Sequence, residues 1–118
     1  MEFDHVGLIT DEKKAGENFV EATRVWVTNP KSNPFNVEWL RFEPDSPVTG
    51  PLRECTHIAY RVDSIDEASK GLKVLLEPFV VSDFVRVAFF QSEDGTVVEF
   101  MEYLHNDGEW FPDDEQQR

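Results

Sequence analysis

The stretch Asp4-His5-Val6-Gly7-Leu8 and the later stretch Thr56-His57-Ile58-Ala59-Tyr60 share one pattern of residues. Each has a histidine followed two places later by a small residue, with larger apolar side chains at the alternate positions. Side chains alternate across a β-strand, so the histidine and the small residue lie on one face and the larger apolar residues on the other. The two histidines are 52 residues apart. This recurrence predicts a chain built from two similar halves.

The predicted elements have the same order in both halves, which indicates an α+β fold. The first half has a strand at 3–10, a helix at 11–23 and strands at 24–28 and 36–42. The second half has a strand at 56–62, a helix from 65 to about 71 and strands at 74–81, 84–90 and 96–103. The first helix is predicted from a cap at Thr10 or Asp11 and a stripe of apolar residues at helical spacing. Ser64 and Glu67 form a capping box for the second.

A segment with three prolines and one glycine, 43–51, divides the chain almost in half. It predicts a break between two modules of one domain. We expect a single domain over 1–118, with a first module at about 1–44, a linker at 45–55, a second module at about 56–104 and an acidic tail at 105–118. A module of about 55 residues buries its sheet poorly by itself, whereas two paired modules can do so.

Composition excludes several classes of partner. Eleven Lys and Arg against 24 Asp and Glu give a formal charge of −13. That balance argues against binding nucleic acid or an anionic membrane surface, because both rest on clustered cations. The acidic N-terminus does not resemble a signal peptide, and no apolar run is long enough to cross a bilayer. The single cysteine, Cys55, excludes an internal disulfide. We therefore expect a soluble, cytoplasmic, acidic, small globular domain.

Two histidines and two glutamates occupy matching places in the two halves. His5 and His57 lie on the first strand of each half, and Glu38 and Glu99 each interrupt an apolar closing strand. A carboxylate there is costly to bury unless a cation or strong donors compensate it. Two imidazoles and two carboxylates form a plausible octahedral or trigonal-bipyramidal site. Nitrogen and oxygen donors without thiolate suit a divalent metal ion such as Zn²⁺, Ni²⁺, Co²⁺, Mn²⁺ or Fe²⁺.

The chain resembles the vicinal oxygen chelate superfamily, which includes glyoxalase I, methylmalonyl-CoA epimerase, bleomycin-resistance proteins and extradiol dioxygenases. The resemblance lies in the segments 4–8, 56–68 and 94–100, and in 37–47, which is closest to the epimerase branch. It implies two βαβββ modules that form a cupped mixed sheet around a metal. Carried over by position, the family's metal ligands are His5, Glu38, His57 and Glu99. In the lyase and epimerase branches a ligand carboxylate can also move a proton, which nominates Glu99 or Glu38 as the catalytic residue.

The leading hypothesis is therefore a metal-dependent lyase or isomerase of glyoxalase or epimerase type. Its substrate would have two neighbouring oxygens that chelate the metal, and the cation would stabilise the enolate formed when the adjacent carbon loses a proton. A second hypothesis is a non-catalytic binding protein of the same fold, with an aromatic cleft built from residues such as Trp26, Trp39 and Phe42. A third is an iron-dependent dioxygenase, which would need His, His and Glu and leave Glu38 without a metal.

Two departures from the family pattern lead to further expectations. The spacing from histidine to glutamate is nine residues shorter in the first half than in the second, so we expect a shortened or missing strand there. An incomplete sheet leaves an edge to cover, which predicts a homodimer. Only four arginines on predicted strands could meet an anionic substrate such as glutathione or a CoA ester: Arg24, Arg41, Arg61 and Arg86.

Overall fold

A computed structural model of the chain describes residues 1–105. Its strands form one eight-stranded sheet. The strands are β1 (Glu2–Ile9), β2 (Asn18–Val20), β3 (Val25–Val27), β4 (Val37–Phe42), β5 (His57–Arg61), β6 (Lys73–Val81), β7 (Val85–Gln91) and β8 (Val97–Tyr103). The helical segments are a 3₁₀ turn at Pro30–Ser32, α1 (Pro51–Glu54) and α2 (Ile65–Ala68). The predicted strands fall within a residue or two of those observed, whereas helix α2 ends at Ala68, three residues before the predicted stop near 71. Strand β2 and helix α1 were not predicted.

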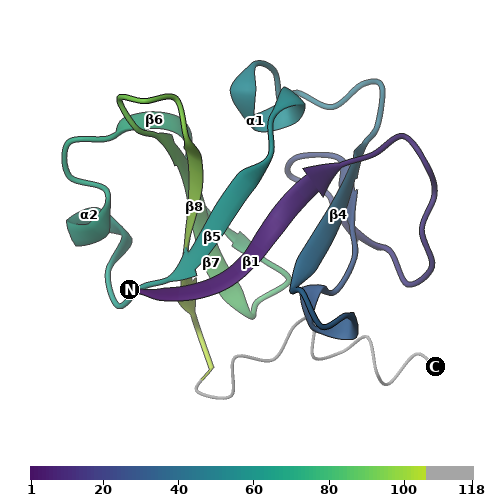
Figure 1. The fold of residues 1–118 in the computed structure, drawn as a ribbon, viewed down its shortest axis with the longest axis horizontal. Helices are drawn as coiled ribbons and strands as arrows, with labels where there is room; N and C mark the ends of the chain where they lie inside the picture. The colour runs from purple at the N-terminus through teal and green to yellow at the C-terminus, as the bar shows by residue number, and fades with distance from the viewer. Residues whose placement is uncertain (106–118) are drawn as a thin grey trace.

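The two halves of the sheet have the same arrangement of strands on either side of its centre. The order is β2-β3-β4-β1-β5-β8-β7-β6, with β1 and β5 as antiparallel neighbours in the middle. Each central strand pairs in parallel with the last strand of its own module, β1 with β4 and β5 with β8. The outer pairs are antiparallel on both sides. The sheet curls into a cup (Figure 1). This arrangement confirms the predicted α+β fold of two repeated modules.

In the second module a short helix covers the outer face of the sheet. The hydroxyl of Ser64 accepts a hydrogen bond from the Glu67 amide at 3.1 Å, as the capping motif predicted. Glu102 on β8 accepts the Ile65 amide at 2.5 Å. Ile65 is buried against Phe90 and Phe100 of the sheet. Helix α2 is therefore fixed at its N-terminus and packed by one apolar residue, and it forms a small second core on that face.

The prediction of a helix at 11–23 in the first module is wrong. Gly16 has φ +73°, a left-handed conformation that interrupts a helix. Thr10 does accept an amide hydrogen bond, from Glu12 at 3.0 Å, but in an isolated turn. Phe19, expected on the helix, lies in β2 and packs on Trp26 of β3 with ring centroids 4.8 Å apart. This cross-strand aromatic pair replaces the helical stripe. With β2 and β3 of three residues each, the first module is shortened, as predicted.

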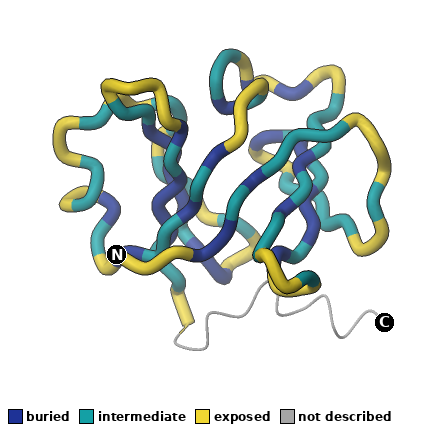
Figure 2. The backbone as a smooth tube through the Cα atoms, viewed as in Figure 1, coloured by how far each residue is buried: buried dark blue, intermediate teal, exposed yellow. Residues whose placement is uncertain are grey.

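The main core lines the inside of the cup, and the proposed linker contributes to it. Dark blue buried segments follow the central strands in Figure 2. Val48 and Leu52 come from 45–55 and are buried among residues of both modules. Pro51 begins helix α1 after Gly50, which has φ +74°. The segment is thus part of the packed structure. Within residues 1–105, no helix has the length and apolar character needed to cross a bilayer.

Candidate metal centre

The four central strands each carry one of the four residues predicted as metal ligands. His5 lies on β1, Glu38 on β4, His57 on β5 and Glu99 on β8. All four residues are buried, and both histidines have no exposed surface. Buried acids are rare in proteins unless they are paired or coordinate a metal. The structure therefore brings together the complete predicted set, from stretches of chain far apart in sequence.

The register of the sheet explains why these side chains meet. Gly7 lies between His57 on β5 and Glu38 on β4, and Ala59 lies between His5 on β1 and Glu99 on β8. Each imidazole thus lies beside a small residue of the other module. A Cβ atom built on Gly7 would fall 2.1 Å from Cε1 of His57. The small residue two places after each histidine makes room for the other ring.

The nitrogen and oxygen atoms of the group face one another. Nε2 of His5 lies 3.3 Å from Oε1 of Glu38 and 3.2 Å from Oε1 of Glu99. Nε2 of His57 lies 3.6 Å and 3.2 Å from the same two oxygens. One potential ligand atom from each residue lies within 4.8 Å of all the others. Opposite ligands of an ion with bonds of about 2.1 Å are about 4.2 Å apart, so small movements would bring the four atoms to bonding distance.

Charges within the group shift the pKa values of its members. Burial disfavours a charged imidazole, but Glu38, Asp4 and Glu99 together raise the pKa of His5 well above 6.5. Burial likewise acts against the Glu99 carboxylate, yet the adjacent imidazoles of His5 and His57 lower its pKa. Without a metal ion, a proton on the imidazole of His5 therefore offsets part of the negative charge of the two carboxylates.

Asp4 contacts one of the candidate ligands, and the sequence pattern did not single it out. Its Oδ1 lies 2.7 Å from Nδ1 of His5, and its Oδ2 accepts a hydrogen bond from the Tyr103 hydroxyl at 3.0 Å. The guanidinium of Arg61 lies 3.8 Å from the same Oδ2. Burial acts to raise the pKa of Asp4, but the hydrogen bonds from His5 and Tyr103 lower it below 3.8. An ionised Asp4 can only accept, so Nδ1 of His5 carries the hydrogen and Nε2 is directed at the carboxylates.

Asp4→Asn is expected to weaken metal binding without unfolding the chain. A carboxylate behind a ligating histidine fixes its tautomer and raises its basicity, and loss of such a partner typically costs about 10–100-fold in metal affinity. Asp63→Asn is the matched control, because Asp63 is exposed. Isothermal titration of both variants with zinc chloride measures the difference. Equal affinities in the two variants would show that Asp4 does not support the site.

Among the described residues, Nδ1 of buried His57 has no hydrogen-bond partner, and its Nε2 lies near Glu38 and Glu99 without meeting hydrogen-bond geometry. A buried polar atom without a partner is costly, and it is rare in native proteins unless an ion or water supplies the missing contact. Two imidazoles and two carboxylates are ligands that a divalent transition metal prefers, and no thiol joins them because Cys55 is exposed elsewhere. The residues present therefore fit a divalent metal ion, as the sequence predicted.

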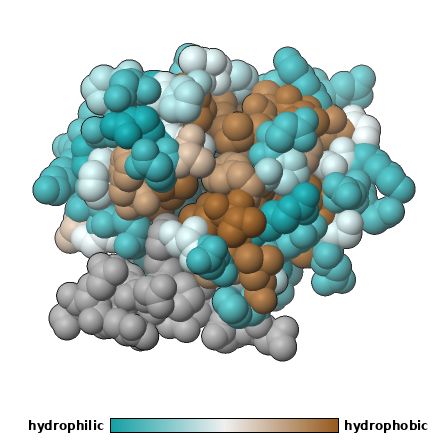
Figure 3. All heavy atoms as spheres, turned by 180° about the vertical axis from the view of Figure 1, so that it is seen from behind, coloured by the Kyte–Doolittle hydropathy of each residue, from teal (hydrophilic) through white to brown (hydrophobic). Residues whose placement is uncertain are grey.

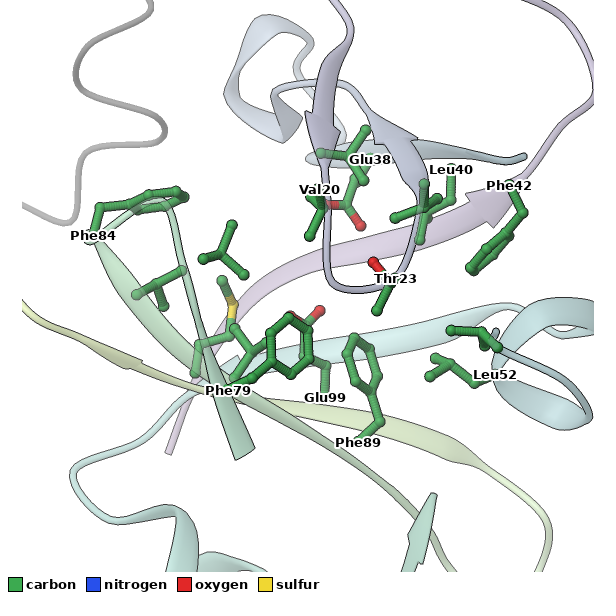
Figure 4. Close-up of a pocket in the computed structure, with 17 residues that line it drawn as sticks. Val20, Thr23, Glu38, Leu40, Phe42, Leu52, Phe79, Phe84, Phe89 and Glu99 are labelled. Carbon is green, nitrogen blue, oxygen red and sulfur yellow. The ribbon is translucent and has the colours of Figure 1, made fainter. Parts of the chain in front are cut away.

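A cavity opens above the two glutamates. Figure 4 shows Glu38 and Glu99 among side chains that point into it from both modules. It includes about 530 Å³ of empty space, its open mouth counted. Phe42, one of the aromatic residues predicted for a cleft, lines it, but Trp26 and Trp39 do not. Trp39 follows Glu38 directly, so alternation places it on the opposite face of β4.

Comparisons with known proteins support the fold. No family model and no curated protein matches this sequence. A solved structure of a hypothetical protein from Bacillus halodurans C-125 is similar, with 20% identity, 89% of this chain and 96% of that chain covered and a TM-score of 0.65. A glyoxalase family protein from Bacillus cereus has 15% identity, coverage of 89% and 95% and a TM-score of 0.39, a likeness too low for any conclusion. The repeated strand order and the curled eight-stranded sheet are those that the resemblance to the vicinal oxygen chelate superfamily predicted, and the similarity to the Bacillus halodurans protein, at 20% identity, shows the fold alone.

Proposed function

We propose that this protein binds a divalent metal ion through His5, Glu38, His57 and Glu99 and acts as a lyase or isomerase of glyoxalase or epimerase type. The substrate class is a small molecule with two neighbouring oxygens. The observation that carries the proposal is the buried set of two imidazoles and two carboxylates, of which both carboxylates line a cavity. When bound, the cation supplies a positive charge that stabilises the negative charge developing as a carbon beside a carbonyl loses its proton.

Residues of the chain would transfer the proton, orient the ligands and exclude water. Glu38 and Glu99 both reach the cavity, so a carboxylate oxygen of either can accept the proton and return it to a neighbouring atom or to the other face. Asp4 holds His5 in one tautomer. Phe89 packs edge-on against the His57 ring with centroids 5.4 Å apart and lines the same cavity. It keeps the ring in place and excludes water beside it.

The alternatives differ in what they require of Glu38 and the metal. A dioxygenase would leave Glu38 without a metal, yet its Oε1 lies about as close to His5 as that of Glu99 does, which supports four ligands. A non-catalytic binding protein is favoured by one observation, the apolar wall of the cavity. It predicts binding of a small molecule without bound metal and without turnover.

The test is metal analysis of protein purified without chelator, followed by a screen of 2-oxo, 2-hydroxycarbonyl and thioester substrates. We expect stoichiometric divalent metal and proton exchange or isomerisation of at least one substrate. Metal without turnover would favour a binding role at a metal site. Absence of metal, even after incubation with zinc, nickel, cobalt, manganese and iron salts, would contradict the proposal.

Metal binding at neutral pH is expected to release about one proton per chain, because the ion needs the lone pair on Nε2 of His5. Since the pKa of His5 is raised well above 6.5, protons compete at pH 7, and apparent affinity should rise about tenfold per pH unit until that pKa is passed. Conversely, His5 stabilises the metal-free fold most below its unfolded pKa, and this contribution is lost as pH rises through the folded pKa. Titration calorimetry in buffers of different ionisation enthalpy counts the protons, and a count of zero would contradict this assignment.

We further propose a homodimer in the cytoplasm. The edge strands β2 and β6 are each paired on one side only within the described sheet, which supports a partner at an edge. The exposed free Cys55 is compatible with a reducing compartment. Light scattering coupled to gel filtration gives the oligomeric state, and a mass near 13.7 kDa would contradict the dimer.

A further inference from the structure

The wall of the cavity above the glutamates is almost entirely apolar. Of the 17 residues within 1–105 that line it, only Thr23, Glu38 and Glu99 have polar side chains. Phe79 and Phe84 form one side of it, and hydrophobic side chains also gather across the middle of the face seen in Figure 3. A wall of this kind favours the apolar body of a ligand and gives no hydrogen bonds to a charged one.

No lysine or arginine of residues 1–105 lines the cavity. The four arginines that could have met an anionic substrate have carboxylate partners elsewhere. Arg24 pairs with Asp45 at 2.7 Å, Arg41 with Glu17 at 2.7 Å, Arg61 with Asp4 at 3.8 Å and Arg86 with Glu102 at 3.1 Å. A phosphate or carboxylate on the ligand would therefore find no cation along the described wall.

The floor adds no net positive charge either. The two carboxylates Glu38 and Glu99 carry two negative charges, which cancel the double charge of the ion that we propose there. An anionic ligand would thus enter an apolar space whose floor is neutral with metal and acidic without it. Because a charge taken from water into such a space without a partner is costly, the cavity disfavours anions in the metal-free state, and in the metal-bound state it disfavours any charge that lies along the wall, away from the ion.

We infer that the ligand of this cavity is a neutral, predominantly apolar small molecule carrying two neighbouring oxygens, and not an anionic thioester or glutathione conjugate. The requirement for two oxygens rests on the proposed function, whereas neutrality and apolar character rest on the wall.

The experiment compares two probes of similar size and the same aromatic ring. 1-Phenylpropane-1,2-dione is neutral, and benzoylformate carries a carboxylate beside its ketone. Both are titrated into the full chain, once after metal removal and once after loading with zinc. We expect the dione to bind about tenfold more tightly than benzoylformate in the metal-free protein, which corresponds to about 1.4 kcal/mol. Zinc should narrow this ratio, because the carboxylate of benzoylformate can then coordinate the ion.

Two variants test whether the residues of the cavity wall cause the preference for the neutral dione. Phe79→Ala removes a half-buried ring of the cavity and should weaken dione binding about fivefold, as expected when apolar contact area is lost. Phe35→Ala is the matched control, because Phe35 is 78% exposed and does not line the cavity. Thr23→Lys places a cation among the lining residues and should shift the preference towards benzoylformate about tenfold, since a nearby opposite charge offsets part of the cost of burying an anion.

Equal or tighter binding of benzoylformate by the metal-free wild-type protein would overturn the inference, as would failure of both probes to bind. Equal effects of the two phenylalanine variants would also overturn it. If Phe79→Ala does not fold, the inference is still tested by Thr23→Lys and by the affinities of the wild-type protein for the dione and benzoylformate. Metal content is measured separately, so a protein that binds the dione but takes up no metal would contradict the proposed function and leave the selectivity of the wall established.

Discussion

Protein carrying His57→Ala is expected to lose its stoichiometric metal ion while keeping its fold. His57 has no exposed surface, and its Nε2 lies 3.2 Å from Glu99 and 3.6 Å from Glu38. Removing it takes away one of only two nitrogen ligands from a site built of four. In wild-type protein, zinc at about 100 times its dissociation constant should raise the free energy of unfolding by about 2.7 kcal/mol. In the variant this gain should disappear.

The measurement combines metal analysis after equilibrium dialysis with thermal unfolding in the presence and absence of zinc. Glu99→Ala should give the same loss, because its Oε1 lies 3.2 Å from Nε2 of both histidines. His105→Ala and Glu77→Gln are matched controls, since both residues are exposed, and both variants should keep the ion. Full metal content in His57→Ala and in Glu99→Ala would remove these residues from the site.

The candidate site could be predicted from the sequence because it depends on strand parity and repetition. His5 and His57 are each followed two places later by a small residue, and the sheet pairs Gly7 with His57 and Ala59 with His5. The alternation of apolar residues set which face each side chain would occupy. A one-residue error in register would have moved these side chains to the other face, so the pattern was a strong constraint.

Features that depend on tertiary contacts could not be predicted in this way. The apolar spacing at 11–23 suited a helix, but Phe19 gains a partner in Trp26 only after β2 pairs with β3. Asp4 precedes His5 and by simple alternation should face away from it. A register irregularity between Phe3 and His5 accompanies its contact with the ring. Its second partner, Tyr103, lies 99 residues away in sequence.

Gly7→Ala is the smallest substitution from which we expect a large effect. The added Cβ would fall 2.1 Å from Cε1 and 2.5 Å from both ring nitrogens of His57. Either the ring or strand β1 must therefore move. Overpacking in a filled core typically costs about 1–3 kcal/mol of stability. A displaced ring would also be misplaced as a ligand, so we expect zinc affinity to fall at least about tenfold, which corresponds to about 1.4 kcal/mol.

A double-mutant cycle separates displacement of the ring from a general effect of alanine in strand β1. In a His57→Ala background the methyl group of Gly7→Ala has room, because the atoms it would meet are gone. Urea unfolding of the four proteins should then show that Gly7→Ala costs about 1–3 kcal/mol in the wild type and much less beside His57→Ala, a coupling typical of residues in direct contact. An equal cost in both backgrounds would mean that the ring of His57 does not lie over Gly7, and that the absence of a side chain at position 7 is not what allows the two histidines to meet.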